Sequence, residues 1–462
     1  MILKHFAGFA IRICLLVSIL GASRHNCAAQ EPDTLQDDTV KRYDVLIQGG
    51  KVVDGTGAPW FVADVGIRNG KIAKIGKLQA TDATRVIDAT GLIVAPGFID
   101  MMGQSASPMV NDPKSALNLL TQGITTINAG EGISAAPVDH NEELRKGWTT
   151  MAEYMALLDM HGLPVNVAQS VGHTQVRRMV LGAVDRRPGP SELLQMQELV
   201  RESMQAGAIG LSTALIYPPA TFAQTEEIAA LAKVVGEFGG AYFTHMRNEG
   251  DKLLEAIDEA VEIGRVGRVP VHIFHLKTAG QQNWGKMPLA IAKIKAARAS
   301  GHSVTADIYP YINNGLEISA FVHPRHFAAG REAFLRKWND PDFRKEVRQE
   351  MESADGWENW YRNVNRDWGR VIIGQTSERR YAEQFGQSIS KIAEIHQEDP
   401  WETFASLVRA SAFALPQSMS EANKVLALQQ DFISFCTDVG PDNGSLSASH
   451  PRAYGSFPKL IS

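Results

Sequence analysis

The chain has 462 residues, of which 44% are hydrophobic and 21% are charged, with 40 glycines and 21 prolines. This is ordinary globular usage, and it excludes the disordered, collagen-like, coiled-coil and disulfide-scaffold classes of protein. The formal net charge of -5 provides no basic surface, so we do not expect nucleic acid or anionic membranes as partners.

The first thirty residues have the pattern of an export signal. Lys4 and Arg12 precede an apolar run over residues 13–22, and the small residues Ala28 and Ala29 follow. This order predicts a signal peptide over residues 1–29, cleaved after Ala29, and a secreted or periplasmic protein. Cleavage removes three cations and no acids, which takes the net charge from -5 to -8. We expect no transmembrane segment in the mature chain, since no later run reaches the roughly 18 apolar residues that span a bilayer.

A small β domain is predicted next. Residues 30–42 are polar and acidic, which favours a disordered lead-in. From Tyr43 onward, short alternating runs are separated by glycines, and Asn69-Gly70 between two such runs indicates a hairpin. We therefore expect residues 43–91 to form a small β domain.

The remaining residues, 92–462, alternate between strand-like and helix-like segments. Eight short apolar runs are strand candidates: residues 92–99, 124–129, 165–171, 208–211, 241–243, 271–274, 303–308 and 432–436. Eight strands alternating with helices predict a (β/α)8 barrel. Residues 312–430 are too long for one connection, and we expect an insertion over the barrel mouth. No clear helix follows the eighth run, which suggests that the C-terminal part of the barrel is truncated.

Reactive side chains follow four of these runs. His245 and His275 end the fifth and sixth runs, Glu131 follows the second, and Asp438 follows the eighth. Functional groups of such barrels lie at the C-terminal ends of the strands, and this set can bind zinc while leaving a position for water. Glu131 is either the third metal ligand or a carboxylate of its glycine-flanked turn.

A mechanism follows from these residues. A divalent ion held by His245 and His275 would acidify a bound water and polarise a carbonyl oxygen. Asp438 would take the proton of that water and return it to a leaving nitrogen.

Several longer motifs point to a known family. They include GGKVVDGTGAPW (residues 49–60), RVIDATGLIVAPGFID (85–100), GLSTALIYPP (210–219), THMRNEGD (244–251), HLKTAG (275–280), DIYPY (307–311) and HPRAYG (450–455). With these motifs the chain resembles the N-acyl-D-amino-acid deacylases (D-aminoacylases) of the amidohydrolase superfamily, from about residue 43 to 458. The resemblance implies a TIM barrel with a small β-sandwich built from both chain ends. It also implies zinc-dependent hydrolysis of N-acyl-D-amino acids.

The resemblance also assigns residues. His245 and His275 match the metal-binding histidines of the family, and Asp438 matches its catalytic aspartate. Four further positions match residues that hold the substrate carboxylate and the scissile region: Lys277, Tyr217, Tyr309 and Arg452. The alternative for the two tyrosines is packing at the rim. His173 is expected to line the pocket without being a ligand.

The chain departs from the family at three places. Met102 and Gln104 replace the usual His-x-His pair, and neither is a good zinc ligand, so we expect one ion per chain. Glu131 stands where the deacylases have a cysteine, and this harder ligand would admit other divalent ions. The family also continues well beyond the position that Pro458 matches.

Several functions remain open at this point. D-aminoacyl peptides are alternative substrates, and so is a cyclic amide such as a hydantoin-like ring. A barrel that binds a ligand without turning it over is a further alternative, since the histidine pair is lost. The pattern does not predict an oligomeric state.

Overall fold

The computed structural model describes residues 41–139, 144, 146–353, 355–442 and 450–461. The predicted signal peptide and most of the predicted lead-in lie outside these residues. The chain divides into two compact units, Met1–Gly97 and Phe98–Ser462. Within the described ranges, no helix combines the length and the apolar character that crossing a membrane requires.

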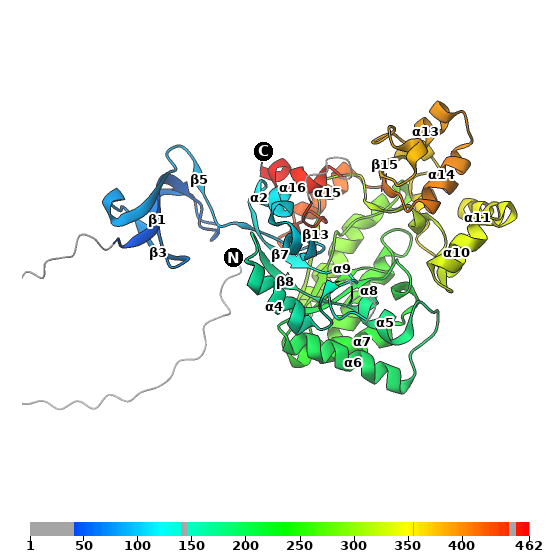
Figure 1. The fold of residues 1–462 in the computed structure, drawn as a ribbon, viewed down its shortest axis with the longest axis horizontal. Helices are drawn as coiled ribbons and strands as arrows, with labels where there is room; N and C mark the ends of the chain where they lie inside the picture. The colour runs from blue at the N-terminus through cyan, green and yellow to red at the C-terminus, as the bar shows by residue number, and fades with distance from the viewer. Residues whose placement is uncertain (1–40, 140–143, 145, 354, 443–449, 462) are drawn as a thin grey trace, which may run out of the picture. The chain divides into compact units, whose positions relative to one another are not determined.

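The N-terminal unit contains one sheet of five strands (Figure 1). They are β1 (Tyr43–Val52), β2 (Phe61–Arg68), β3 (Lys71–Gly76), β4 (Ala83–Asp88) and β5 (Ile93–Val94), in the order β3-β2-β1-β4 with β5 paired to β1. The predicted hairpin is confirmed, because β2 and β3 pair antiparallel across Asn69 and Gly70. Both residues have positive φ angles, 52° and 70°, as a tight hairpin turn requires.

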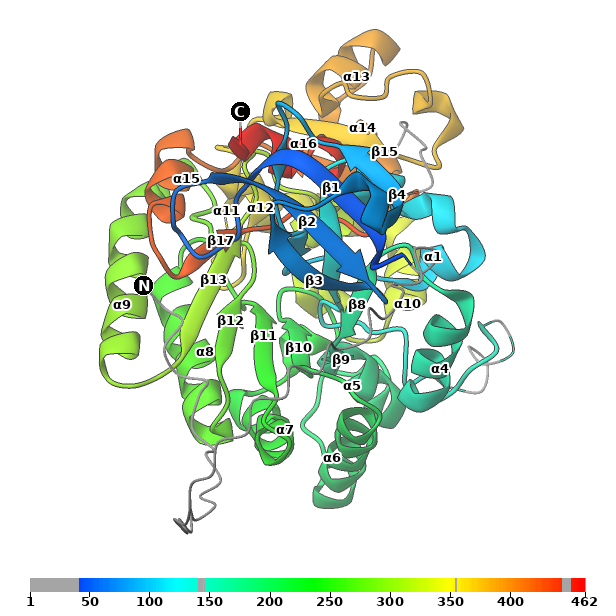
Figure 2. The same ribbon diagram turned by 90° about the vertical axis from the view of Figure 1, so that its left-hand side faces the viewer.

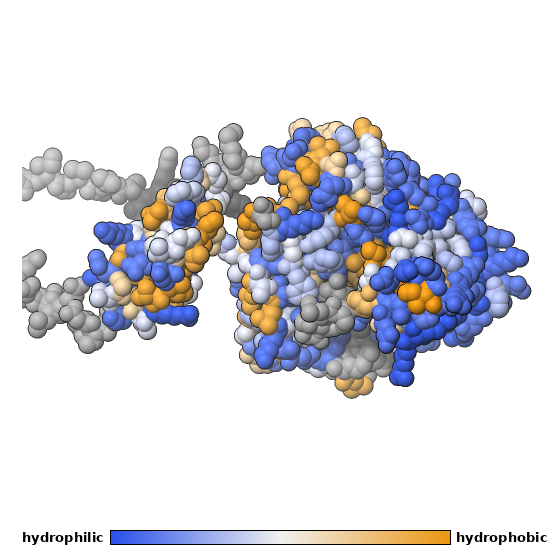
Figure 3. Space-filling model, turned by 90° about the horizontal axis from the view of Figure 1, so that it is seen from above, coloured by the Kyte–Doolittle hydropathy of each residue, from blue (hydrophilic) through white to orange (hydrophobic). Residues whose placement is uncertain are grey.

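The implied β-sandwich is wrong for the described residues, since residues 41–97 form only this one sheet. The resemblance placed the second layer partly at the other end of the chain, but the described residues there form a helix. Several large apolar side chains of the N-terminal unit are more than half exposed: Trp60, Val62, Ile72 and Ile93. Figure 3 shows hydrophobic residues of this unit, in orange, at its surface.

Eight parallel strand positions build the second unit (Figure 2). They are β6 (Phe98–Asp100), β7 (Ile124–Ala129), β8 (Asn166–Gln169) with β9 (Val171–Gly172), β10 (Gly210–Ala214), β11 (Ala241–His245), β12 (Val271–Ile273), β13 (Val304–Ile308) and β17 (Ile433–Phe435). Backbone pairing connects β6-β7-β8 and β9-β10-β11-β12-β13-β17, which is the strand order of a (β/α)8 barrel. Each predicted run overlaps one of these strands.

Side chains join the seam between β17 and β6. The Asp100 carboxylate accepts hydrogen bonds from the backbone N–H and the hydroxyl of Thr437. The rings of Phe98 and Phe435 lie edge to face, 6.4 Å apart. The first and last strands are therefore held together by a buried polar contact and an aromatic contact.

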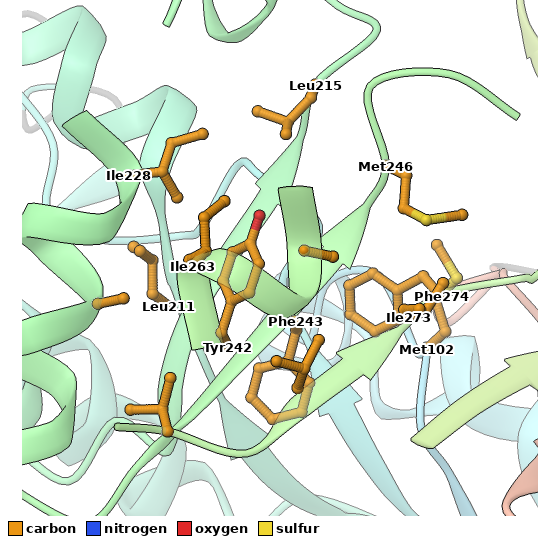
Figure 4. Packing of buried hydrophobic residues seen from close by; sticks show 14 of the residues in the cluster. Met102, Leu211, Leu215, Ile228, Tyr242, Phe243, Met246, Ile263, Ile273 and Phe274 are labelled. Atoms are coloured by element: carbon orange, nitrogen blue, oxygen red, sulfur yellow. The ribbon is translucent and has the colours of Figure 1, made fainter. Parts of the chain in front are cut away.

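Helices cover the outside of these strands. The main ones are α4 (Met151–His161), α6 (Pro190–Gln205), α7 (Thr225–Glu237), α8 (Leu253–Gly267), α9 (Met287–Ala299) and α15 (Glu421–Leu428). Apolar side chains from strands and helices form one large core, in which Tyr242 of β11 lies near Ile228 and Ile263 of the helices (Figure 4). This core makes the strand ends a rigid platform for a site.

The connection between β13 and β17 has a core of its own. It contains a three-stranded antiparallel sheet of β14 (Leu316–Glu317), β16 (Phe413–Pro416) and β15 (Val371–Gln375). Five helices accompany this sheet: α10 (Arg331–Trp338), α11 (Pro341–Ser353), α12 (Trp360–Asn363), α13 (Ile389–His396) and α14 (Pro400–Arg409). Trp338, Trp360 and Phe404 fill its buried interior. Helix α15 packs against α9, so it belongs to the barrel layer although it lies within the predicted insertion.

The expectation that no helix follows the eighth strand is wrong. Residues Arg452–Ile461 form α16, which packs against α2 (Leu117–Leu120). Gly455 and Pro458 give this segment a poor helix propensity, which hid the helix in the sequence. Tertiary packing compensates, because the Phe457 ring lies 5.2 Å from Phe98 and 4.6 Å from Phe435.

Candidate metal centre

The four strand-end residues singled out in the sequence come together in the structure. His245 is the last residue of β11, and His275, Glu131 and Asp438 follow β12, β7 and β17 by two or three residues. Glu131 Oε1 lies 2.7 Å from His245 Nδ1 and 3.3 Å from His275 Nε2. One ligand atom from each of these three residues lies within 4.8 Å of the others.

This arrangement fits a divalent cation. Two imidazole nitrogens and one carboxylate oxygen are the usual three protein ligands of a catalytic zinc site. His245 Nε2 is buried without a hydrogen-bond partner, which leaves this nitrogen available to a cation. Burial alone would raise the pKa of Glu131, but contacts with His245 and His275 outweigh it and hold the pKa well below its usual range. The Glu131 side chain is therefore a carboxylate, the charged form that a cation would require of it.

Glu249 is a site residue that the sequence reasoning missed. Its Oε1 lies 2.8 Å from His275 Nδ1, and its Oε2 lies 2.9 Å from Lys277 Nζ and 3.5 Å from His245 Nε2. Glu249 is fully buried behind both imidazoles, on the side opposite Glu131. Burial and the Lys277 ammonium act to lower the pKa of His275. The carboxylates of Glu249 and Glu131 outweigh both and raise this pKa to about 10. The only signal in the sequence was a carboxylate four residues after His245.

Met102 and Gln104 have separate roles. Met102 is 1% exposed and belongs to the hydrophobic core beside Phe274 (Figure 4). Gln104 Nε2 donates to Glu131 Oε2 at 2.6 Å and to Asp438 Oδ1 at 2.8 Å. A neutral amide thus lies between two carboxylates, where the superfamily places a histidine.

Asp438 forms a buried ion pair with Arg452. Burial raises the pKa of the Asp438 carboxyl, and the guanidinium of Arg452 partly offsets that rise. A carboxylate with a raised pKa is suited to general base and acid chemistry. Arg452 Nε is also buried and has no hydrogen-bond partner, which leaves a donor for an anionic ligand.

A central cavity of about 410 Å³ surrounds these groups. All eight predicted site residues line it: Glu131, His245, His275, Asp438, Lys277, Tyr217, Tyr309 and Arg452. The guanidinium of Arg452 lies 4.7 Å from the centre of the Tyr309 ring, and burial raises the pKa of Tyr309 to about 12. Lys277, Arg452 and Tyr309 therefore form one charged wall of the cavity.

His173 does not line this cavity, contrary to expectation. It is fully buried, and its Nε2 lies 2.9 Å from Glu227 Oε1. Arg177 binds the same carboxylate. These buried ion pairs give the cluster a structural role.

Three site residues have backbones in the left-handed region: Gln104 (φ 55°), His275 (φ 33°) and Asp438 (φ 53°). Non-glycine residues rarely adopt this region, and such strain concentrates at functional sites. The strain supports a functional role for Gln104, in addition to the predicted site residues His275 and Asp438.

A barrel with imidazole and carboxylate ligands at the C-terminal ends of its strands defines the class of metal-dependent hydrolases. The model of the Amidohydrolase family matches residues 85–303. D-aminoacylase of Alcaligenes xylosoxydans xylosoxydans is 30% identical over 430 residues, covering 91% of this chain and 78% of that relative. The chain belongs to the D-aminoacylase (N-acyl-D-amino-acid deacylase) family of the amidohydrolase superfamily and is an amidohydrolase that acts on carbon–nitrogen bonds.

Other relatives share parts of the chain. N-acyl-D-glutamate deacylase of the same organism is 37% identical over 281 residues, which are 59% of this chain and 57% of that protein. The solved N-acyl-D-glutamate deacylase of Bordetella bronchiseptica, a complex with zinc and a phosphonate inhibitor, gives a TM-score of 0.73 at 30% identity. That match covers 90% of this chain and 80% of the other. A solved D-aminoacylase with the same TM-score covers 91% and 80%.

Proposed function

We propose that this protein hydrolyses N-acyl-D-amino acids to a carboxylate and a free D-amino acid, with one divalent ion, zinc, per chain. The observation that carries the proposal is the convergence of Asp438 and the three ligand atoms of Glu131, His245 and His275 in one cavity. A D-aminoacylase structure 29% identical to this chain is described with a binuclear metal centre, one-metal activation and second-metal attenuation. The placement of Met102 in the core supports a single ion here.

The chain's own residues would perform distinct steps. Glu131, His245 and His275 would hold the ion, which supplies Lewis-acid chemistry toward the attacking water and the amide carbonyl. Asp438 takes a proton from the attacking water and returns it to the leaving amine nitrogen. Arg452 stabilises the carboxylate of Asp438 before the first transfer and after the second.

Substrate binding is assigned to the charged wall. The ammonium of Lys277 and the free Nε of Arg452 attract the α-carboxylate of the amino acid, while the hydroxyl of Tyr309 orients it. Tyr217, whose ring lies 5.7 Å from His245, borders the scissile amide. Without a free carboxylate, a hydantoin-like ring would not use this wall.

The test is hydrolysis of N-acetyl-D-methionine by zinc-loaded protein, followed as released D-methionine and paired with measurement of bound zinc. Asp438→Asn should retain zinc and lose turnover, because the amide cannot accept the proton. Normal turnover by this variant would refute the role of Asp438. Zinc binding without turnover by the wild-type chain would favour the alternative of a barrel that only binds its ligand.

We also propose that the protein is exported through residues 1–29. Expression of the full chain with a C-terminal tag, followed by N-terminal sequencing of the secreted or periplasmic product, tests this. A mature product beginning at Gln30 is the expected result. An uncleaved chain retained in the cytoplasm would contradict it.

A further inference from the structure

A second cavity opens from the central one. Its volume is about 640 Å³, larger than the 410 Å³ of the central cavity. The two cavities share five lining residues: Gln104, Glu131, Ile216, Tyr217 and Glu317. Since Glu131 is a proposed metal ligand, the second cavity starts at the metal centre and extends away from it.

The walls of this second cavity are mostly apolar. We call it the apolar groove, and its distinctive lining side chains are Ile133, Ala183, Pro218, Ala320, Val322 and Phe327. Ile133 is 53% exposed, so a large apolar side chain there faces open space. The charges that line the groove are at its borders, where Arg331 pairs with Glu317 at 2.6 Å and Arg178 is exposed. An apolar ligand would cover Ile133, while the exposed Arg178 side chain can keep its charged head in water.

The apolar groove leaves the metal centre on a different side from the charged wall. Lys277, Tyr309 and Arg452 line the central cavity and do not line the groove. If the α-carboxylate binds at that wall and the amide lies at Glu131, the acyl group must leave the metal centre on the other side. The shared residues Glu131 and Tyr217 place the opening of the groove at that point.

We propose that the apolar groove binds the acyl chain of the substrate, and that the preferred substrates are amino acids carrying a long, unbranched aliphatic acyl group. This inference rests on the proposed deacylase function and extends it from the amino-acid part to the acyl part. An acetyl group would leave the exposed Ile133 uncovered, whereas an octanoyl chain would extend into the groove and cover it.

Acyl chain length is the first variable to test. Zinc-loaded protein is given the acetyl, butanoyl, hexanoyl and octanoyl derivatives of one D-amino acid, each below its micelle concentration. Each fully buried methylene can increase kcat/KM by about fourfold, so the octanoyl substrate should exceed the acetyl substrate at least tenfold. Equal or falling kcat/KM along the series would overturn the proposal. So would a higher value for a glycyl-glycyl acyl group of similar length, which would assign the groove to peptides.

Two neighbouring residues give a matched pair of variants. Ala183→Trp inserts a large ring into the groove and should reduce the octanoyl-to-acetyl ratio of kcat/KM several-fold. Val184→Trp adds the same ring at the next position, which does not line the groove, and should leave that ratio unchanged. An equal ratio in the two variants would contradict the assignment.

Binding separates this proposal from the deacylase function. If neither substrate is hydrolysed, the proposed function fails, but calorimetry on the zinc-loaded protein still tests the groove. N-octanoyl-D-leucine should then bind at least tenfold more tightly than N-acetyl-D-leucine, and Ala183→Trp should remove the difference. Equal affinities in the wild-type protein would overturn the groove assignment even if the acetyl substrate is hydrolysed.

Discussion

The side-chain amide of Gln104 donates to Asp438 Oδ1 at 2.8 Å, across 334 residues of sequence. Its second hydrogen points to Glu131 Oε2 at 2.6 Å. Since both neighbours are carboxylates, only the nitrogen of the amide can face them, and this fixes its orientation. Gln104 therefore couples the proposed base to a proposed metal ligand.

Gln104→Met tests this coupling with little change in side-chain volume. Removing both donors leaves two buried carboxylates without their shared partner. Hydrogen bonds to charged groups contribute about 1.5–3 kcal/mol, so kcat should fall by roughly ten- to a hundredfold. Steady-state kinetics against Gln197→Met, a helix α6 variant distant from the cavity, provides the comparison. Equal kcat values for the two variants would show that the amide is only structural.

Glu249→Gln should weaken metal binding although it replaces none of the proposed ligands. The Glu249 carboxylate lies behind both imidazoles and fixes their orientation. Loss of such an outer partner typically reduces metal affinity by about 10–100-fold. Zinc titration with a competing chelator measures the effect, and Glu262→Gln, which removes a surface ion pair with Arg265, is the control. Unchanged zinc affinity in Glu249→Gln would show that Glu249 does not contribute to metal binding.

Gly315 has no side chain, and the Arg452 guanidinium occupies the space beside it. A Cβ at this position would lie 2.8 Å from Arg452 Nη2 and 2.7 Å from the Phe413 ring, so one of them would have to move. Gly315→Ala should therefore raise KM for N-acetyl-D-methionine more than it lowers kcat. Gly285→Ala is the control, because a Cβ there meets no atom within 4 Å. A lower kcat with an unchanged KM would contradict a role in carboxylate binding.

The amino-acid side chain should be neutral rather than acidic. Among the described residues that line the central cavity, Lys277 pairs with Glu249 and Arg452 pairs with Asp438. A second carboxylate on the substrate would find no further Lys or Arg and would be desolvated near Glu317. We expect kcat/KM for N-acetyl-D-glutamine to exceed that for N-acetyl-D-glutamate at least tenfold. Equal kcat/KM values for this near-isosteric pair would show that the site does not discriminate against a charged substrate side chain.

Much of the site was predictable because of where parallel strands end. His245, His275 and Asp438 each follow an apolar run, and parallel strands bring their carboxyl ends to one edge. The contacts of Glu249 and Gln104 were not predictable, because both depend on loop backbone that only the folded barrel defines. Gln104 was noticed only as a missing histidine, whereas the structure shows a bridge between two carboxylates.

In the fold, too, some elements could be predicted from the sequence and others could not. Strands and the Asn69-Gly70 hairpin follow from local patterns, but α16 depends on aromatic packing against Phe98 and Phe435, which are distant in sequence. The export signal stays a prediction.

Asp100 should make stability depend on pH in a direction unusual for an aspartate. Burial raises its pKa from 3.8 to about 7, although Thr437 and Met102 donate hydrogen bonds to it. The folded protein therefore keeps a proton that the unfolded chain has already lost, and this contribution to stability falls as pH rises from about 4 to about 7. The side chain of Asp100→Asn does not titrate, so the stability of this variant relative to wild type should rise with pH.

Urea unfolding of both proteins measures this difference. Between about pH 5 and about pH 8, the free energy of unfolding of wild type should fall by about 3 kcal/mol more than that of Asp100→Asn. Asp112→Asn, at an exposed turn, should instead follow wild type. If wild type and Asp100→Asn change in parallel, Asp100 is ionised in the folded protein and the seam between β6 and β17 contains a buried charge.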